Sequence, residues 1–244
     1  MYKEVIKKVI DAPEINELLQ SALRNSDEPP TLISFVNPYS YMVLRDNRQV
    51  ANQVDIYFSD ALVSSSLFSS FAMKKVPRVS FDYGSFAKTF FEKVCETEHA
   101  VYFVGSKLEQ VSDAVASFQK VYPRLKVAGY RHGYFVDDNE KAQVAEEIAN
   151  SGAAFVVCGM GTPYQENFGA LLKGAKGSIK QIYTCGGFLH QSSEALEYYP
   201  SWINRLNLRW LYRAIKEDYV MNRLLVQYPQ FLFLAFYDFL KRSL

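Results

Sequence analysis

Six short apolar runs, separated by longer amphipathic stretches, limit the folds that this chain can adopt. The runs are TLISFV (31–36), VDIYF (54–58), AVYFVG (100–105), LKVAGY (125–130), AAFVVCGMG (153–161) and IKQIYTCGG (179–187). The stretches between them, such as 106–123 and 139–152, have the apolar spacing of helices. Strands that alternate with helices form βαβ units, which build mostly parallel sheets. The sequence therefore predicts an α/β fold with a mostly parallel sheet flanked by helices.

The alternation stops near residue 194, and the remaining chain has a different character. Residues 201–244 show helical spacing interrupted near Pro229, and they carry seven Lys and Arg against three Asp and Glu. We therefore expect two parts, residues 1–193 as the sheet domain and residues 194–244 as a basic, aromatic helical appendage. A helix in this appendage would align its arginines in one stripe. Such a stripe either meets phosphates and lipid headgroups, or stays in solvent while the helix docks.

Composition and spacing argue against several classes of function. The net charge of +1 is too small for general nucleic-acid binding, which needs a basic excess to neutralise phosphates. The three cysteines stand far apart without a CxxC or Cys/His cluster, so we expect free thiols in a reducing compartment. No D-x-D triplet is present to hold a metal, and we predict no metal site. Because the sequence lacks a signal-peptide core and an apolar run of about 18 residues, we expect a cytoplasmic protein.

The stretch CGMGTPYQE stands where a buried apolar run ends. Gly159 and Gly161 would let the backbone approach a ligand, and a helix that starts near Thr162 and Pro163 would direct free N–H groups at an anion. An ordinary strand-to-helix turn with Thr162 as N-cap is the other interpretation, and it leaves Gln165 unexplained. In the first helical turn, Gln165 is placed to hydrogen-bond a base or a sugar. The GxGxxG dinucleotide fingerprint is absent, and we predict no cofactor.

Other polar groups follow the predicted strands, at the edge where parallel sheets bind ligands. Asp60 stands just past one strand, where a partly shielded carboxylate can serve as a general base, although a helix N-cap role is equally open. His132 and Gly133 lie in the GYRHGYF bend, in which a lone histidine is more often structural. CGGFLHQSS places Gly186 and Gly187 after the last strand. The G-x-S-x-G elbow of a serine hydrolase is missing.

Three stretches occur in the order found in one known family. They are YFVGSKLEQVSDAVASFQKVYPRLKVAGYRHGYF, VVCGMGTPYQE and LNLRWLYRAIKEDYVMNRL. Together they resemble the WecG/TagA/CpsF glycosyltransferases, glycosyltransferase family 26, over nearly the whole chain. The resemblance implies a Rossmann-like domain that transfers a sugar from a UDP-sugar to an undecaprenyl-diphosphate-linked saccharide, with inversion and without a metal, in bacterial surface polysaccharide synthesis. It also implies an appendage that closes the site and touches the cytoplasmic membrane face. The sequence leaves a homo-oligomer open.

The resemblance also assigns roles to matching positions. Asp60 matches the proposed catalytic base, and Asn37 in SFVNPYS matches an asparagine at a strand end. The tail arginines are expected to hold the diphosphate: Arg205, Arg213 and Arg223. The residues expected to form the nucleotide-sugar site are His132, Gly133, Gly159, Gly161, Thr162, Gln165, Gly186 and Gly187.

Four positions depart from the family pattern. Phe35 replaces a threonine, Ala61 replaces a glycine, Arg209 replaces a glutamate and His190 replaces an aspartate. The departures leave open a different donor sugar or acceptor, and also a member that binds a nucleotide sugar or a lipid without catalysis. A soluble dinucleotide-dependent oxidoreductase is a third class, which the missing GxGxxG disfavours.

Overall fold

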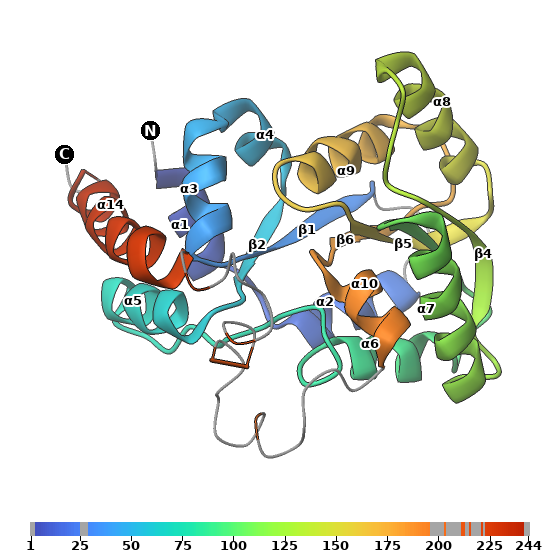
Figure 1. The fold of residues 1–244 in the computed structure, drawn as a ribbon, viewed down its shortest axis with the longest axis horizontal. Coiled ribbons are helices and arrows are strands. Elements are labelled where there is room, and N and C mark those ends of the chain that lie inside the picture. Colours follow the sequence, from blue (N-terminus) through green and yellow to red (C-terminus); the bar gives the residue numbers. More distant parts are fainter. Residues whose placement is uncertain are drawn as a thin grey trace.

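The computed structural model in Figure 1 describes residues 3–24, 29–195 and 223–241, together with positions 203, 211, 212, 215 and 221. Within this part of the chain, six strands form one sheet in the order β2-β1-β6-β5-β3-β4, and every pairing is parallel. The strands are β1 (Thr31–Val36), β2 (Ile56–Ser59), β3 (Ala100–Gly105), β4 (Lys126–Arg131), β5 (Ala153–Gly159) and β6 (Gln181–Thr184). The predicted α/β, Rossmann-like fold is confirmed.

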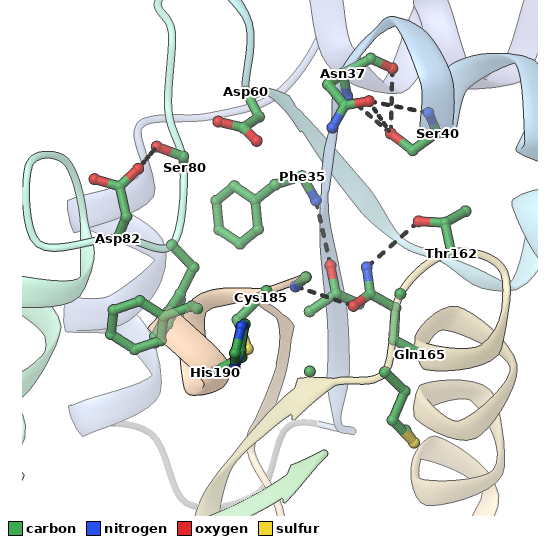
Figure 2. Close-up of a pocket in the computed structure, with 18 of the residues that line it drawn as sticks. Phe35, Asn37, Ser40, Asp60, Ser80, Asp82, Thr162, Gln165, Cys185 and His190 are labelled. Carbon is green, nitrogen blue, oxygen red and sulfur yellow. Dashed lines mark hydrogen bonds between the residues drawn. The ribbon is translucent and has the colours of Figure 1, made fainter. Parts of the chain in front are cut away.

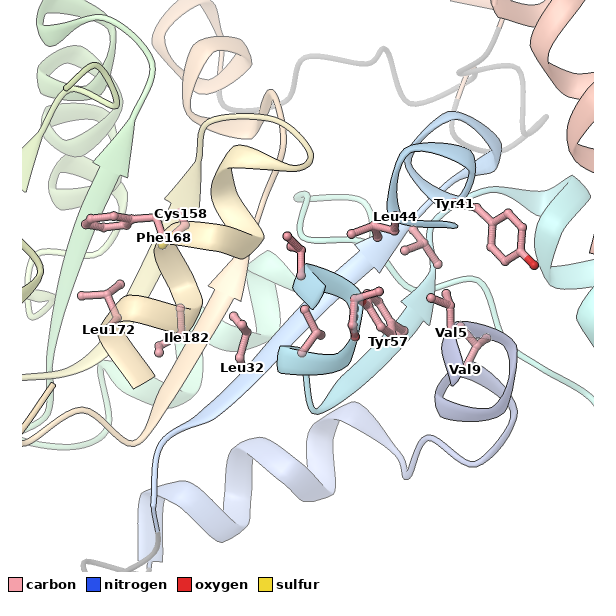
Figure 3. Close-up of a cluster of buried hydrophobic side chains, with 14 of the residues drawn as sticks. Val5, Val9, Leu32, Tyr41, Leu44, Tyr57, Cys158, Phe168, Leu172 and Ile182 are labelled. Atoms are coloured by element: carbon pink, nitrogen blue, oxygen red, sulfur yellow. Dashed lines mark hydrogen bonds between the residues drawn. The ribbon is translucent and has the colours of Figure 1, made fainter. Parts of the chain in front are cut away.

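Helices cover both faces of this sheet, and each layer shares one hydrophobic cluster. The first layer consists of α1 (Lys3–Ile10), α3 (Pro38–Asp46), α4 (Arg48–Gln53), α5 (Leu62–Ala72), α8 (Asp138–Ala149), α9 (Tyr164–Gly174) and α14 (Tyr228–Leu240). The second layer consists of α2 (Ile15–Arg24), α6 (Ala87–Val94), α7 (Leu108–Val121) and α10 (Phe188–Glu194). Figure 3 shows part of the first cluster, to which both strands and helices contribute side chains.

The central strands are mostly apolar and buried because both of their faces are covered. On β1, Leu32 and Val36 belong to the first cluster, whereas Ile33 and Phe35 belong to the second. This alternation places Ser34 on the same face as Leu32 and Val36, opposite Phe35. The edge strand β4 is instead only half-buried. Burial on two faces therefore explains why the sequence shows continuous apolar runs rather than an alternating pattern.

The C-terminal helix α14 packs on α3 and α5 (Figure 1), following a π-helical turn, η1 (Arg223–Gln227). Phe231 is fully buried, and its ring centroid lies 5.3 Å from that of Tyr41 on α3. Asp238, 1 % exposed, accepts hydrogen bonds from Tyr41 Oη at 2.8 Å and from Arg45 Nε at 2.8 Å. Pro229 lies in the first turn, where a proline is tolerated. These contacts attach α14 to the helix that begins at the end of β1.

Candidate active site

A cavity of about 1060 Å³ lies at the carboxyl edge of the sheet, lined by residues that follow the described strands. Figure 2 shows side chains around it. Most of the predicted site residues line it, namely Asn37, Asp60, Gly133, Gly159, Gly161, Thr162, Gln165, Gly186 and Gly187. Tyr228, at the start of α14, lines it as well. The cavity therefore brings together segments that lie nearly 200 residues apart in the sequence.

Four predicted residues are not placed in this wall. His132 is absent from the described wall, and its Nδ1 accepts a hydrogen bond from the Tyr134 backbone N–H at 3.3 Å, which is a local role within the bend. Arg205 and Arg213 lie outside the described residues, and Arg223 is described only in its backbone, within η1. The diphosphate-binding role of these arginines stays a prediction.

Asp60 follows β2 directly, and its backbone N–H donates to the Val36 carbonyl at 2.8 Å. Its side chain is 33 % exposed, which gives the partly shielded position that a general base needs. Arg78 holds it in place: Nη2 donates to Asp60 Oδ1 at 3.1 Å, and Nε donates to the Asp60 carbonyl at 2.6 Å. The N-cap of α5 is Ala61, so the N-cap interpretation of Asp60 is wrong.

Arg78 connects Asp60 to a second carboxylate. Its Nη2 also lies 3.3 Å from Asp82 Oδ2 and donates to Ser80 Oγ at 2.8 Å, while Ser80 donates in turn to Asp82. Burial alone would lower the pKa of the Arg78 guanidinium, but the carboxylates of Asp60 and Asp82 outweigh it and raise that pKa. The arginine therefore stays charged and favours an ionised Asp60.

Asn37 is the N-cap of α3. Its Oδ1 accepts from the Ser40 N–H at 3.0 Å, and its own N–H donates to Ser40 Oγ at 2.8 Å, which completes a capping box. This cap fixes the side chain at the end of β1, on the cavity wall. A catalytic role for Asn37 stays a prediction.

At the floor of the site, the side chains of Phe35 and Ser34 lie on opposite faces of β1. The Phe35 ring lines the cavity and packs against Phe58 and Phe81, with centroid distances of 5.9 and 6.2 Å. Ser34 is fully buried on the opposite face and donates to Glu166 Oε1 at 2.9 Å. The family pattern has a threonine hydroxyl at position 35. The Ser34 hydroxyl cannot take its place in the cavity, because it lies on the other face of β1.

The GMGTPYQE segment forms a turn whose caps differ from the prediction. Gly161 has φ = 73°, a conformation that glycine adopts readily. Helix α9 begins at Tyr164, with Pro163 in the N-cap position, so the alternative interpretation, in which Thr162 is the N-cap, is wrong. Thr162 Oγ1 instead donates to Glu166 Oε1 at 3.0 Å. Gln165, only 3 % exposed, also lines the cavity.

The opposite end of the cavity lies where β3 and β5 end side by side. A Cβ atom added at Gly105 would lie 2.3 Å from the carbonyl oxygen of Gly159. Only glycine therefore lets the two backbones come this close. Ser106 follows with φ = 56°, an uncommon conformation for a residue other than glycine. Beside it, the side chains of Gln110 on α7 and His190 on α10 meet at 2.7 Å, between Nε2 and Nδ1. A junction of this type, where the chain reverses strand order, is a frequent nucleotide site in α/β folds.

Sequence reasoning missed Arg78, Asp82, Gln110 and Tyr228 as residues of the wall. Gln110 lies inside a stretch that resembles the family but was not singled out there, and Arg78 stands in the run KKVPRVSFD, which matches no motif. The short parallel bridge between Ser59 and Arg78 is what brings that run beside Asp60. Only long-range pairing supplies this signal.

Across the ranges that the structure describes, no group of three or more His, Cys, Asp or Glu could hold a metal ion. Over the same residues, no helix has both the length and the apolar character that crossing a membrane requires.

Comparison with known proteins identifies relatives of the chain. A model of the WecG/TagA/CpsF glycosyltransferase family matches residues 4–244. A Shigella boydii protein named UDP-Gal:alpha-D-GlcNAc-diphosphoundecaprenol beta-1,4-galactosyltransferase is 32% identical over 95% of this chain and 93% of its own length. A Bacillus subtilis N-acetylglucosaminyldiphosphoundecaprenol N-acetyl-beta-D-mannosaminyltransferase is 31% identical over 51% of this chain and 47% of its own length. With this match over nearly its whole length, the chain belongs to the WecG/TagA/CpsF family of glycosyltransferases.

Proposed function

We propose that this glycosyltransferase moves galactose from UDP-galactose to an N-acetylglucosaminyl-diphosphoundecaprenol acceptor, with inversion and without a metal ion, in surface polysaccharide synthesis. The Shigella boydii relative, whose name states this donor and acceptor, aligns with almost the entire chain, whereas the mannosaminyltransferase relatives align with about half of it. The observation that carries the proposal is one cavity that is lined both by Asp60, held by Arg78, and by the glycine turn that contains Gly159 and Gly161.

In the proposed reaction, Asp60 takes the proton from the acceptor hydroxyl. The hydroxyl oxygen then bonds to the anomeric carbon of galactose while the bond from that carbon to the diphosphate oxygen breaks. Because attack and departure occur on opposite faces of the sugar, the anomeric configuration inverts. UDP leaves with the bonding electrons. Arg78 supports this step by favouring the ionised form of Asp60 before the acceptor arrives.

The departing diphosphate needs compensation of its negative charge. We assign this role to the backbone N–H groups of the glycine turns and to Arg205, Arg213 and Arg223, since guanidinium groups bind phosphate oxygens in a bidentate geometry. Positive side chains that bound the diphosphate would make a metal ion dispensable. Gln165 contributes a hydrogen bond to the donor from the cavity wall.

The acceptor is attached to a lipid, so the enzyme must work at a membrane surface. Supporting this, η1 and α14 expose apolar side chains: Leu225, Val226, Leu232, Phe233, Phe236 and Leu240. We call this set the α14 apolar face. We propose that it enters the headgroup region of the cytoplasmic leaflet and makes the protein peripheral to the membrane.

The test combines purified protein, N-acetylglucosaminyl-diphosphoundecaprenol and labelled UDP-galactose, UDP-GlcNAc or UDP-ManNAc. We expect a labelled disaccharide lipid with galactose, a β linkage by proton coupling constants, and an unchanged rate in EDTA. Transfer from UDP-ManNAc alone would replace the donor assignment, and an α product would exclude inversion. UDP binding without transfer from any donor would support the alternative of a binding protein that lacks catalysis.

A further inference from the structure

Behind the cavity wall lies a buried carboxyl group that the proposed reaction does not use. Glu166, in the first turn of α9, has no exposed surface. Its Oε1 accepts three hydrogen bonds, from Ser34 Oγ at 2.9 Å, Thr162 Oγ1 at 3.0 Å and Gln165 Nε2 at 3.1 Å. A carboxyl group is costly to bury, so an arrangement that gathers three donors on one oxygen requires a reason.

The donors come from separate segments of the site. Ser34 belongs to β1, Thr162 to the turn after β5 and Gln165 to α9. The chain of hydrogen bonds continues to β6, because Thr184 Oγ1 donates to Ser34 Oγ at 3.0 Å. Thr162, Gln165 and Thr184 also line the cavity. One carboxyl oxygen thus connects several segments of the cavity floor from behind.

The side-chain amide of Gln165 contacts this carboxyl, and its Nε2 also donates to Thr162 Oγ1 at 3.4 Å. Its Nε2 donates to Glu166 Oε1, so its own Oε1 points to the other side, where it accepts from the Gly186 N–H at 3.1 Å. A flipped amide would place an N–H group against the Gly186 N–H and an oxygen against the Glu166 oxygen. Both contacts would be repulsive, so Glu166 and Gly186 together permit a single orientation.

We infer that Glu166 is a positioning residue that sets the orientation of the Gln165 amide and thereby the affinity of the cavity for the nucleotide-sugar donor. The inference rests on the proposed function, because it takes Gln165 as a donor contact. Glu166 itself has no contact with substrate, since its side chain is completely covered by protein.

The experiment compares two substitutions of Glu166 with a matched control. Glu166→Gln keeps an oxygen acceptor, and Glu166→Met keeps the volume without it. The control is Gln181→Met at the amino end of β6, because Gln181 is 4 % exposed, donates to the Leu18 carbonyl at 2.9 Å and accepts from Tyr183 Oη. It removes buried hydrogen bonds of the same sheet, away from the cavity.

The probes are UDP, measured by calorimetric titration, and UDP-galactose, measured by KM and kcat. For Glu166→Met we expect the UDP Kd and the donor KM to rise about tenfold or more, with a smaller change in kcat. For Glu166→Gln, the UDP Kd and the donor KM should both stay within about threefold of wild type. Gln181→Met should lower the melting temperature and leave the UDP Kd unchanged. Unchanged UDP binding by Glu166→Met, or an equal loss in Gln181→Met, would overturn the inference.

Two further measurements separate this inference from the proposed function. In a double-mutant cycle, Glu166→Met should add little to the effect of Gln165→Met on the UDP Kd; additive effects would overturn a role through Gln165. Side-chain amide NMR reads the orientation without any ligand. The Gln165 amide protons should exchange slowly in wild type and Glu166→Gln and faster in Glu166→Met. Equal exchange rates of the Gln165 amide protons in wild type and Glu166→Met would overturn the inference. Failure of the wild-type protein to bind UDP would instead contradict the proposed donor.

Discussion

At the scale of single residues, the candidate site depends on charges whose neighbours hold them in place. Arg78 lies between Asp60 and Asp82 and contacts both carboxylates. A mobile carboxylate would have to be oriented at the moment of proton transfer, whereas one already held at 3.1 Å from a guanidinium needs little rearrangement. The same reasoning applies to Gln165, whose amide is oriented from behind by Glu166.

The base assignment predicts a specific kinetic effect. We expect Asp60→Asn to lower the transfer rate ~10²–10⁴-fold, because an amide cannot accept the proton of the acceptor hydroxyl. UDP affinity should stay near that of wild type, as measured by calorimetry beside the transfer assay. Asp46→Asn, at a side chain that is 77 % exposed, serves as the control. Transfer by Asp60→Asn at the wild-type rate would exclude Asp60 as the base.

The buried Glu166 predicts how stability changes with pH. Burial raises the pKa of its carboxyl, so the folded protein holds this proton more tightly than the unfolded chain does. Its contribution to stability is therefore fully present below the unfolded pKa and is lost as pH rises through the folded pKa. Burial also raises the pKa of the nearby Tyr57 and Cys158, which stay neutral over this range.

The measurement is the free energy of unfolding in urea, for wild type and Glu166→Gln. The free energy of unfolding of wild type minus that of Glu166→Gln should fall as pH rises from about 4 towards neutrality. The variant serves as the reference because glutamine does not titrate. A difference that stays constant with pH would show that the folded and unfolded pKa values are the same.

At the scale of elements, α14 depends on one buried ion pair. Asp238 has no exposed side-chain surface, and Arg45 Nε and Nη2 donate to its two oxygens at 2.8 and 3.1 Å. Tyr228 at the start of the same helix lines the cavity. Fixing α14 on α3 therefore also fixes one side of the site.

We expect Asp238→Asn to destabilise the protein by about 2–3 kcal/mol, because it leaves the Arg45 charge poorly compensated. Backbone amides of α14 should exchange hydrogen faster, and those of β5 should change least. Hydrogen exchange with mass spectrometry and thermal unfolding measure both effects. The comparison variant is Asp138→Asn, whose side chain is 98 % exposed. Unaltered exchange in α14 would argue that its apolar contacts alone hold it.

At the scale of the whole molecule, the cavity and the α14 apolar face belong to one arrangement. The α14 helix contributes Tyr228 to the cavity, and Phe233 on the same helix is 72 % exposed. An enzyme that must reach a lipid-linked acceptor gains from having its membrane contact close to its reaction site. The division into residues 1–193 and 194–244 stays a prediction, although α14 shares a core cluster with the sheet domain.

Membrane association should depend on this face. We expect Phe233→Ser with Phe236→Ser to weaken binding to vesicles of anionic phospholipid about tenfold or more, because two large apolar side chains lose their contact with lipid. Co-sedimentation across a range of lipid concentrations measures the effect. Leu171→Ser on α9, at a side chain that is 40 % exposed, is the matched control. Equal loss in both variants would show that replacing any exposed apolar side chain with serine weakens vesicle binding, and would contradict a role for this face.

The sequence by itself determined the parallel α/β sheet and the family, and most of the site residues that it predicted line the cavity. Strand and helix periods are local properties, and the carboxyl ends of parallel strands meet at one edge whatever the strand order. Only the tertiary structure decided the partners of those residues. Arg78 meets Asp60 through a bridge between distant segments, and Thr162 donates to Glu166 rather than capping α9. Which charge is buried and which groups compensate it depends on packing between elements, and sequence spacing carries no record of that packing.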